Sequence, residues 1–184
     1  MTRIIRSITP DHALEALELV QEVFTQHSDE QEGRVVRRLV EEIRSKRFYV
    51  PALEITAVDE ENHVIGYCMF SRFHLEGKYE NELLLLSPVA VKTALQRRHI
   101  SKDMIEFGFD LARQMGYKAV IVEGNPRNYR ARGFVTAAQH GILPGDSVHL
   151  PHIDCLMAAE LVPGAFGAIQ GRVEYTDYDT LMEE

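Results

Sequence analysis

The chain has 184 residues, 45% of them apolar and 26% charged, which is typical of a single soluble globular domain. Its formal charge of -8 argues against a non-specific nucleic-acid binder, because phosphate-rich partners select for a basic face. The sequence has no apolar run near the roughly 18 residues that cross a bilayer and no signal-peptide core, so we expect no membrane partner and a cytoplasmic location.

The first third of the chain predicts a strand followed by two helices. The segment "RIIRSI" at 3–8 predicts a short opening strand. Thr9 and Pro10 then mark a helix start, with the threonine as its cap. The polar stretch at 27–33 predicts a loop, and a second amphipathic helix follows at 35–43.

The middle of the chain predicts a sheet. Residues 53–77 are rich in β-branched and aromatic types on both sides of a polar turn, which predicts a hairpin. Residues 82–91 form a near-continuous apolar run, as in a central strand buried on both faces. Pro88 lies inside this run. Because proline donates no ladder hydrogen bond, we expect the pairing of the strand to be interrupted there.

The remaining residues continue this alternation. An amphipathic helix is predicted from about 100 to 115, where Gly116 ends it, and a buried strand follows at 118–124. Two more strands are predicted at 135–140 and 154–161, and the last twenty residues read as a peripheral strand with a frayed acidic tail. Together these elements predict a mixed α/β sheet domain.

The segment "QRRHIS" at 96–101 opens the predicted helix and has the layout of a phosphate-binding loop. A helix start offers unpaired N–H groups and the positive end of a dipole, and Arg97 and Arg98 add charge suited to phosphate oxygens. Such loops usually contain glycine, because the backbone can then approach the anion closely, yet here His99 and Ser101 stand instead. Read alone, the segment is equally a polar turn capped by Ser101.

The order of features over residues 83–134 is more specific. A central strand, a polar loop, an amphipathic helix, a second buried strand and the segment "NYRARGF" resemble the GNAT superfamily of acyl-CoA-dependent N-acetyltransferases. The segment "LVPGAF" at 161–166 is similar to the ending of one bacterial branch. The resemblance implies a mixed, mostly antiparallel central sheet flanked by helices, within one domain over 1–184 that has its core motif at 83–134 and a peripheral segment at 162–184.

The family signature after the central strand is Val-x-Pro-x-x-Gln/Arg-x-x-Gly-x-Gly/Ala. Four residues fit it: Val91, Gln96, Arg97 and Arg98. Three residues depart from it, namely Thr93 at the proline, His99 at the first glycine and Ser101 at the second small residue. The exchange at His99 is the most serious of these departures.

The resemblance also implies which residues bind acetyl-CoA, the expected co-substrate. Main-chain groups of Val89, Ala90 and Val91 would bind its pantetheine arm like an added strand, using the pairing gap at Pro88. N–H groups of the following loop would hold the pyrophosphate, and this set comprises Gln96, Arg97, Arg98, His99, Ile100 and Ser101.

Three residues are candidates for proton transfer. The family places a tyrosine four residues before a Gly-Phe pair and near the cofactor sulfur, which here is Tyr129. Its phenol could give a proton to the departing thiolate, although its position alone fits a half-buried tyrosine packed on the sheet equally well. The attacking amine must be neutral, and Glu82 and Glu123 on the two central strands are the candidate bases. Each of them also reads as a strand-end solvent contact.

Other polar residues carry weaker signals. The spacing of His149 and His152 could suggest a metal, but no third ligand is placed by the sequence, so we expect no metal site and read them as a loop pair or as part of an acceptor pocket. Cys68 and Cys155 lie in apolar runs without a CxxC motif, which agrees with a reducing compartment. Many members of the family are dimers, which leaves a homodimer open.

Three functions compete at this point. The first is an N-acetyltransferase that moves the acetyl group of acetyl-CoA to a primary amine of a small molecule or peptide, by direct attack. The second is a non-catalytic module of the same fold that binds acyl-CoA through a degenerate pyrophosphate loop, and His99 favours it. The third is a metal-dependent hydrolase that uses the late histidines. Tyr129 and the arginine pair favour the transferase.

Overall fold

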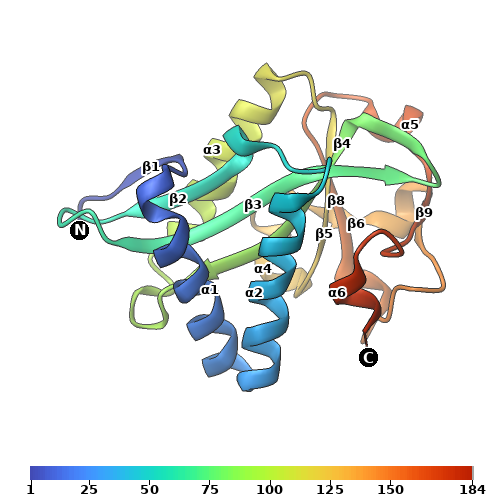
Figure 1. Cartoon of the computed structure of the whole chain (residues 1–184). Coiled ribbons are helices and arrows are strands. Elements are labelled where there is room, and N and C mark those ends of the chain that lie inside the picture. The colour runs from blue at the N-terminus through green and yellow to red at the C-terminus, as the bar shows by residue number, and fades with distance from the viewer. Residues whose placement is uncertain (184) are drawn as a thin grey trace. The chain divides into compact units, whose positions relative to one another are not determined.

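The computed structural model describes residues 1–183 and contains one seven-stranded sheet with helices around it (Figure 1). In sheet order its strands are β1 (Ile4–Ser7), β2 (Glu54–Val58), β3 (Val64–Leu75), β4 (Lys78–Val91), β5 (Ala119–Glu123), β8 (Leu156–Glu160) and β6 (Val135–Thr136). The pair β4–β5 is parallel, whereas β1–β2, β2–β3, β5–β8 and β6–β8 are antiparallel. This mixed, mostly antiparallel sheet confirms the predicted fold class.

The other elements of residues 1–183 are a small second sheet, six α-helices and five short 3-10 helices. In the second sheet β7 (Ile142–Pro144) and β9 (Gly171–Val173) pair in parallel. The α-helices are α1 (Ala13–His27), α2 (Glu30–Ser45), α3 (Ile100–Gln114), α4 (Pro126–Arg130), α5 (Ala165–Ala168) and α6 (Asp179–Met182). Within residues 1–183, no helix combines the length and the apolar character that a bilayer crossing needs.

The chain divides into two compact units. Unit 1 comprises Met1–Phe70 and Ser87–Gly108, and unit 2 comprises Ser71–Leu86 and the residues from Phe109 onward. Each unit is therefore built from two separate stretches of the sequence. The single domain expected over 1–184 stays a prediction.

In unit 1, α1 and α2 form an antiparallel helical hairpin whose turn is much shorter than expected (Figure 1). The polar stretch 27–33, predicted as a loop, is helical from Glu30 onward. The reason is a cap: the Asp29 carboxylate accepts a hydrogen bond from the Glu32 N–H at 2.9 Å. Gly33 lets the helices approach, since a Cβ there would lie 2.0 Å from the hydroxyl of Thr25.

Helix α3 packs against one face of β2 and β3. Gly66 of β3 makes room for it, because an added Cβ would lie 2.9 Å from the side chain of Ile100. Gly108 does the same from the helix side, where a Cβ would meet the ring of Phe70 at 2.2 Å. These two glycines bring the helix that follows the candidate phosphate loop onto a rigid sheet.

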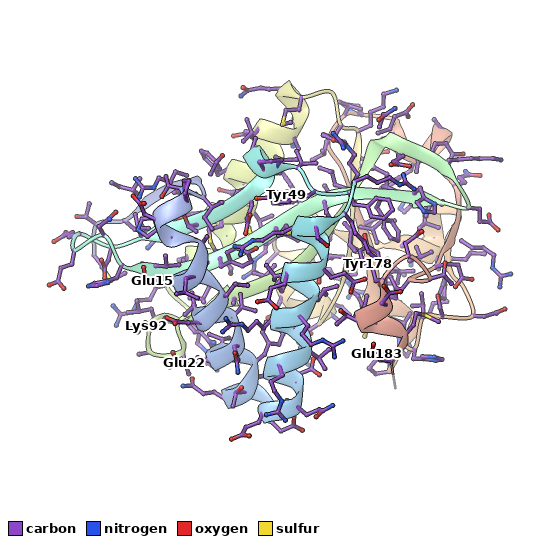
Figure 2. All side chains as sticks on the ribbon, viewed as in Figure 1. Glu15, Glu22, Tyr49, Lys92, Tyr178 and Glu183 are labelled. Atoms are coloured by element: carbon purple, nitrogen blue, oxygen red, sulfur yellow. The ribbon has the colours of Figure 1, made fainter. Side chains whose placement is uncertain are left out.

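The opposite face of the same strands contains a buried carboxylate. Glu54 is 1% exposed, and its Oε1 accepts hydrogen bonds from Arg44 Nε at 2.9 Å and from the Tyr67 hydroxyl at 2.7 Å. Its Oε2 accepts one from Tyr49, which follows the C-terminal end of α2 and is labelled in Figure 2. Burial and the neighbouring carboxylate raise the pKa of Tyr49, so its phenol stays a donor. This cluster fixes the end of α2 to the sheet.

In unit 2, the C-terminal segment is ordered rather than frayed, so that prediction is wrong for the residues described, up to 183. Tyr175 and Tyr178 are 8% and 1% exposed. The Glu174 carboxylate accepts hydrogen bonds from the N–H groups of Asp146 and Ser147, both at 3.0 Å. Burial of two aromatic rings outweighs the acidic composition that suggested fraying.

Candidate functional site

The predicted site residues fall into two groups, one in each unit. In unit 1, the loop between β4 and α3 has an unusual backbone. Arg97 and His99 have φ values of +63° and +62°, which lie in the left-handed region that residues other than glycine seldom adopt. Both side chains are exposed. The position where the family signature has glycine therefore keeps the backbone conformation of glycine although it carries histidine.

Two left-handed residues with one ordinary residue between them have the pattern of an anion-binding loop. Left-handed residues that alternate with other conformations create a concave arrangement of N–H groups that binds anions. Helix α3 begins directly afterwards, and its first intrahelical backbone bond comes from Asp103 N–H to His99 O at 3.0 Å. The N–H groups of the first turn precede any intrahelical acceptor, so they add to the positive end of the helix dipole.

The side chains around the loop hold its shape. The Gln96 amide donates back to the carbonyl oxygen of Val91 at 3.3 Å, which closes the loop onto the end of β4. Thr93, which replaces the proline of the signature, donates its hydroxyl proton to Gln26 of α1 at 2.5 Å. The side chain of Ile100 is 1% exposed, so only its main chain can serve a ligand. Arg97 and Arg98 are exposed and supply the positive charge.

The end of β4 supplies a strand edge. The register between β4 and β5 in the described chain comprises three pairs, from Leu83↔Ala119 to Leu85↔Ile121. It ends at Leu85, before Pro88, which agrees on the β5 side with the predicted interruption of pairing. Strand β4 continues beyond the proline through Val89, Ala90 and Val91. The N–H of Lys92 then donates a hydrogen bond to Ile65 O of β3 at 2.9 Å.

In unit 2, Tyr129 is held by its ring. It lies in α4, half-buried, and packs edge-on against Phe134 with the ring centroids 5.5 Å apart. A Cβ at Gly124 would lie 2.4 Å from a carbon of the Tyr129 ring, so this ring rests directly on the backbone after β5. Asn125 starts α4 by accepting a hydrogen bond from Arg127 N–H at 3.0 Å. The tyrosine therefore has a fixed place beside the C-terminal end of β5.

Glu123 is the last residue of β5 and lies next to that place. Its Oε2 accepts a hydrogen bond from the Tyr175 hydroxyl at 2.9 Å. The residue is solvent-accessible, yet partial burial of its carboxyl raises the pKa of Glu123 above the ordinary value. The Tyr175 hydrogen bond and the charge of His149 act in the opposite direction and lower this pKa. A carboxyl with a raised pKa beside a fixed phenol is the kind of group that acid–base catalysis uses.

Glu82 lies at the other end of the parallel strands. Since Leu83 is opposite Ala119, Glu82 is level with Lys118, whose ammonium lies 3.4 Å from its carboxylate. Glu123 is five residues further along β5, which at about 3.3 Å per residue is roughly 16 Å. The two predicted bases therefore cannot serve the same reacting atom.

Of the two late histidines, His152 has a structural role in the loop before β8. The Nδ1 atom of His152 accepts a hydrogen bond from Asp154 N–H at 3.1 Å, and this contact starts a short 3-10 turn. Among residues 1–183 there is no group of three or more His, Cys, Asp or Glu side chains that could hold a metal ion.

Sequence reasoning did not find Tyr175. It lies 52 residues after Glu123 and outside the family motif, in a segment predicted to be peripheral. No local pattern marks it, because its partner is set by the packing of β9 and by Ser147, whose hydroxyl accepts a hydrogen bond from Tyr175 N–H at 2.8 Å.

Comparison with known proteins gives a consistent result. A model of the acetyltransferase (GNAT) family matches residues 14–140. The chain is 28% identical over 144 residues, 77% of its length and 81% of the relative's, to the uncharacterized N-acetyltransferase YhbS of Escherichia coli strain K12.

Two crystal structures share the fold. One is the GNAT family N-acetyltransferase YhbS from Escherichia coli in complex with CoA, with 24% identity, a TM-score of 0.83, and coverage of 99% of this chain and 92% of that one. The other is a GNAT family acetyltransferase from Brucella melitensis in complex with acetyl-CoA, with 24% identity, a TM-score of 0.70, and coverage of 95% and 96%.

Proposed function

Because the chain belongs to the GNAT family of acetyltransferases, we propose that it transfers the acetyl group of acetyl-CoA to a primary amine of a small molecule or peptide. Relatives of similar fold bind CoA or acetyl-CoA, which supports this co-substrate. A cytoplasmic location suits such a reaction, since acetyl-CoA is an intracellular metabolite.

One observation carries the assignment of the cofactor. The left-handed backbone at Arg97 and His99, directly before the first turn of α3, has the form of an anion cradle without containing a glycine. The exposed guanidinium groups of Arg97 and Arg98 complement a pyrophosphate. Main-chain groups of the loop, including those of Ile100 and Ser101, would hold that pyrophosphate, and the β4 edge at Val89–Val91 would hold the pantetheine arm.

Acetyl-CoA, when bound, supplies the thioester whose carbonyl carbon the amine attacks. The C–N bond forms as the C–S bond breaks, so one proton must leave the amine nitrogen and one must reach the departing sulfur. Tyr129 is proposed to hold the second proton on its phenol and to donate it to the sulfur. Glu123 is proposed to accept the first proton, since its raised pKa makes it a stronger base than an ordinary carboxylate.

The backbone between the two residues supports this division of roles. Gly124 follows the last residue of β5, and its N–H bonds to Cys155 O at 2.9 Å. The Tyr129 ring rests against the same glycine. One short stretch of fixed backbone therefore carries both the proposed proton acceptor and the proposed proton donor.

Glu82 was an equal candidate for the base. Its pairing with Lys118, at the end of the β4–β5 register far from Glu123, favours a structural role. Glu123 is therefore the residue proposed here.

Titration calorimetry with acetyl-CoA tests the cradle. Arg98→Ala is expected to raise the Kd about ten-fold, the effect of losing one charge-assisted contact. Arg47→Ala is the matched control, because Arg47 is also an exposed arginine but follows the C-terminal end of α2, where its guanidinium packs on the Phe48 ring. Equal affinities for both variants and the wild type would remove the loop from the binding site.

A screen for acetylated products then decides between a transferase and a non-catalytic acyl-CoA-binding module. The wild-type protein is incubated with acetyl-CoA and pooled primary amines, and acetylated products are identified by mass spectrometry. Product formation supports the transferase. Binding without product in any pool supports the non-catalytic acyl-CoA module, and absence of binding contradicts both.

A further inference from the structure

Unit 2 contains a contact that the motif residues do not explain. A buried tyrosine from the C-terminal segment, Tyr175, directs its hydroxyl at the carboxylate that ends β5. Tyrosine hydroxyls buried in a protein need a partner, but a backbone carbonyl would satisfy this one as well as Glu123 does. The choice of Glu123, the carboxylate that closely precedes the Tyr129 helix in the chain, needs a further reason.

Tyr175 is held in place from several sides. Its backbone N–H donates to Ser147 Oγ, and Gly145 N–H donates to Val173 O at 2.8 Å, so the strand before it is tied to the loop at 145–149. Its ring packs against Phe73 of β3 with the centroids 6.3 Å apart. The Ser147 hydroxyl also donates a hydrogen bond to the carboxylate of Glu174, and this bond is the chief cause of the lowered pKa of Glu174. The phenol therefore meets Glu123 with little freedom to move.

We infer that Tyr175 is a positioning residue for the proposed base, and that its hydroxyl fixes one oxygen of Glu123 so that the other can accept the proton of the acceptor. This inference rests on the proposed function. It gives the C-terminal segment a part in catalysis, although that segment lies outside the matched family region, which ends at residue 140.

Loss of the Tyr175 hydroxyl has a predictable effect on the pKa of Glu123. A hydrogen bond donated to a carboxylate stabilises its charged form, so loss of the Tyr175 hydroxyl raises the pKa of Glu123 further. The other titratable group that acts on Glu123 is His149, from the loop at 145–149, and Tyr178 acts in turn on Tyr175. Since the charge of His149 also lowers the pKa of Glu123, the measurement is repeated in a His149→Gln background.

The experiment compares Tyr175→Phe with the wild type, since phenylalanine keeps the ring packing and removes only the donor. Tyr117→Phe is the matched control: Tyr117 is equally buried in unit 2, and its hydroxyl accepts a hydrogen bond from Arg72 at 3.2 Å, away from Glu123. The first readout is the carbon-13 NMR titration of the Glu123 carboxyl, assigned with Glu123→Gln. The second is the pH profile of acetyl-CoA hydrolysis, in which water is the acceptor and adds no titrating group.

Tyr175→Phe is expected to move the Glu123 titration and the acid limb of hydrolysis to higher pH by the same amount, with an unchanged KM for acetyl-CoA. Tyr117→Phe is expected to move neither. A Glu123 titration that is identical in Tyr175→Phe and Tyr117→Phe overturns the inference and leaves the proposed function intact. A wild-type protein that neither hydrolyses acetyl-CoA nor acetylates any amine overturns the proposed function, whatever the titration shows. A shifted titration with an unmoved acid limb overturns the positioning role alone.

Discussion

The variants His99→Gly and Arg98→Gly should change the free energy of unfolding in opposite directions. The left-handed conformation of His99, at φ +62°, costs an L-residue about 1–2 kcal/mol, and glycine adopts it freely. A new glycine also lowers the free energy of unfolding by about 0.4–1 kcal/mol, because it gives the unfolded chain more conformational freedom. His99→Gly should therefore stabilise the fold by about 0.5–1 kcal/mol.

Arg98 is the matched position. It is exposed like His99 and does not have a positive φ, so Arg98→Gly only adds freedom to the unfolded chain and should destabilise by about 0.4–1 kcal/mol. The two variants should differ by about 1–2 kcal/mol in the free energy of unfolding. For a chain of this length that difference corresponds to roughly 2–8 °C in Tm.

Urea unfolding followed by circular dichroism measures this difference, and calorimetry with acetyl-CoA measures its consequence. His99→Gly should bind the cofactor at least as tightly as the wild type, because the cradle keeps its shape. His99→Val should bind it more weakly, since a β-branched residue resists the left-handed region. If both glycine variants lose equal stability, His99 is not left-handed in solution and the reasoning for the cradle fails.

Three further variants test other parts of the molecule. Tyr129→Phe should lower kcat by about 10²-fold or more with little change in acetyl-CoA affinity, as measured by steady-state kinetics beside calorimetry. Gly124→Ala should displace the Tyr129 ring, since the new methyl would lie 2.4 Å from it, and should reproduce the kinetic effect without touching the phenol. Glu54→Gln should destabilise the fold by about 3–5 kcal/mol in urea unfolding, because the charge of Arg44 loses its buried partner, whereas the exposed Glu60→Gln should change stability by less than about 0.5 kcal/mol.

Much of the fold could be predicted because its signals are local. The run at 82–91, the amphipathic period before Gly116 and the polar hairpin turn each depend on neighbouring residues only. The error at 27–33 had a local signal too. Asp29 and Glu32 have the spacing of a capping box, which marks a helix start despite the polar composition around it.

The roles of Glu82 and Glu123 could not be predicted, because they depend on strand register. Both residues flank apolar strands in the sequence, and a parallel pairing of two strands can slide by several residues without changing either pattern. Only the observed alignment of Leu83 with Ala119 places one carboxylate at the end that Tyr129 occupies and the other beside Lys118. The contact of Glu123 with Tyr175 is equally hidden, since 52 residues separate the two.

The glycine missing from the phosphate loop shows what a sequence signature describes. A signature states residue types, but the ligand meets main-chain N–H groups whose directions depend on φ and ψ. Glycine is common in such loops because it reaches the left-handed region at no cost, not because the ligand contacts it as glycine. His99 reaches the same region at a cost of about 1–2 kcal/mol, a loss that a folded chain of this size can offset through packing such as that of Ile100 against Gly66. The departure at His99 therefore argues for a strained cradle rather than for a lost one.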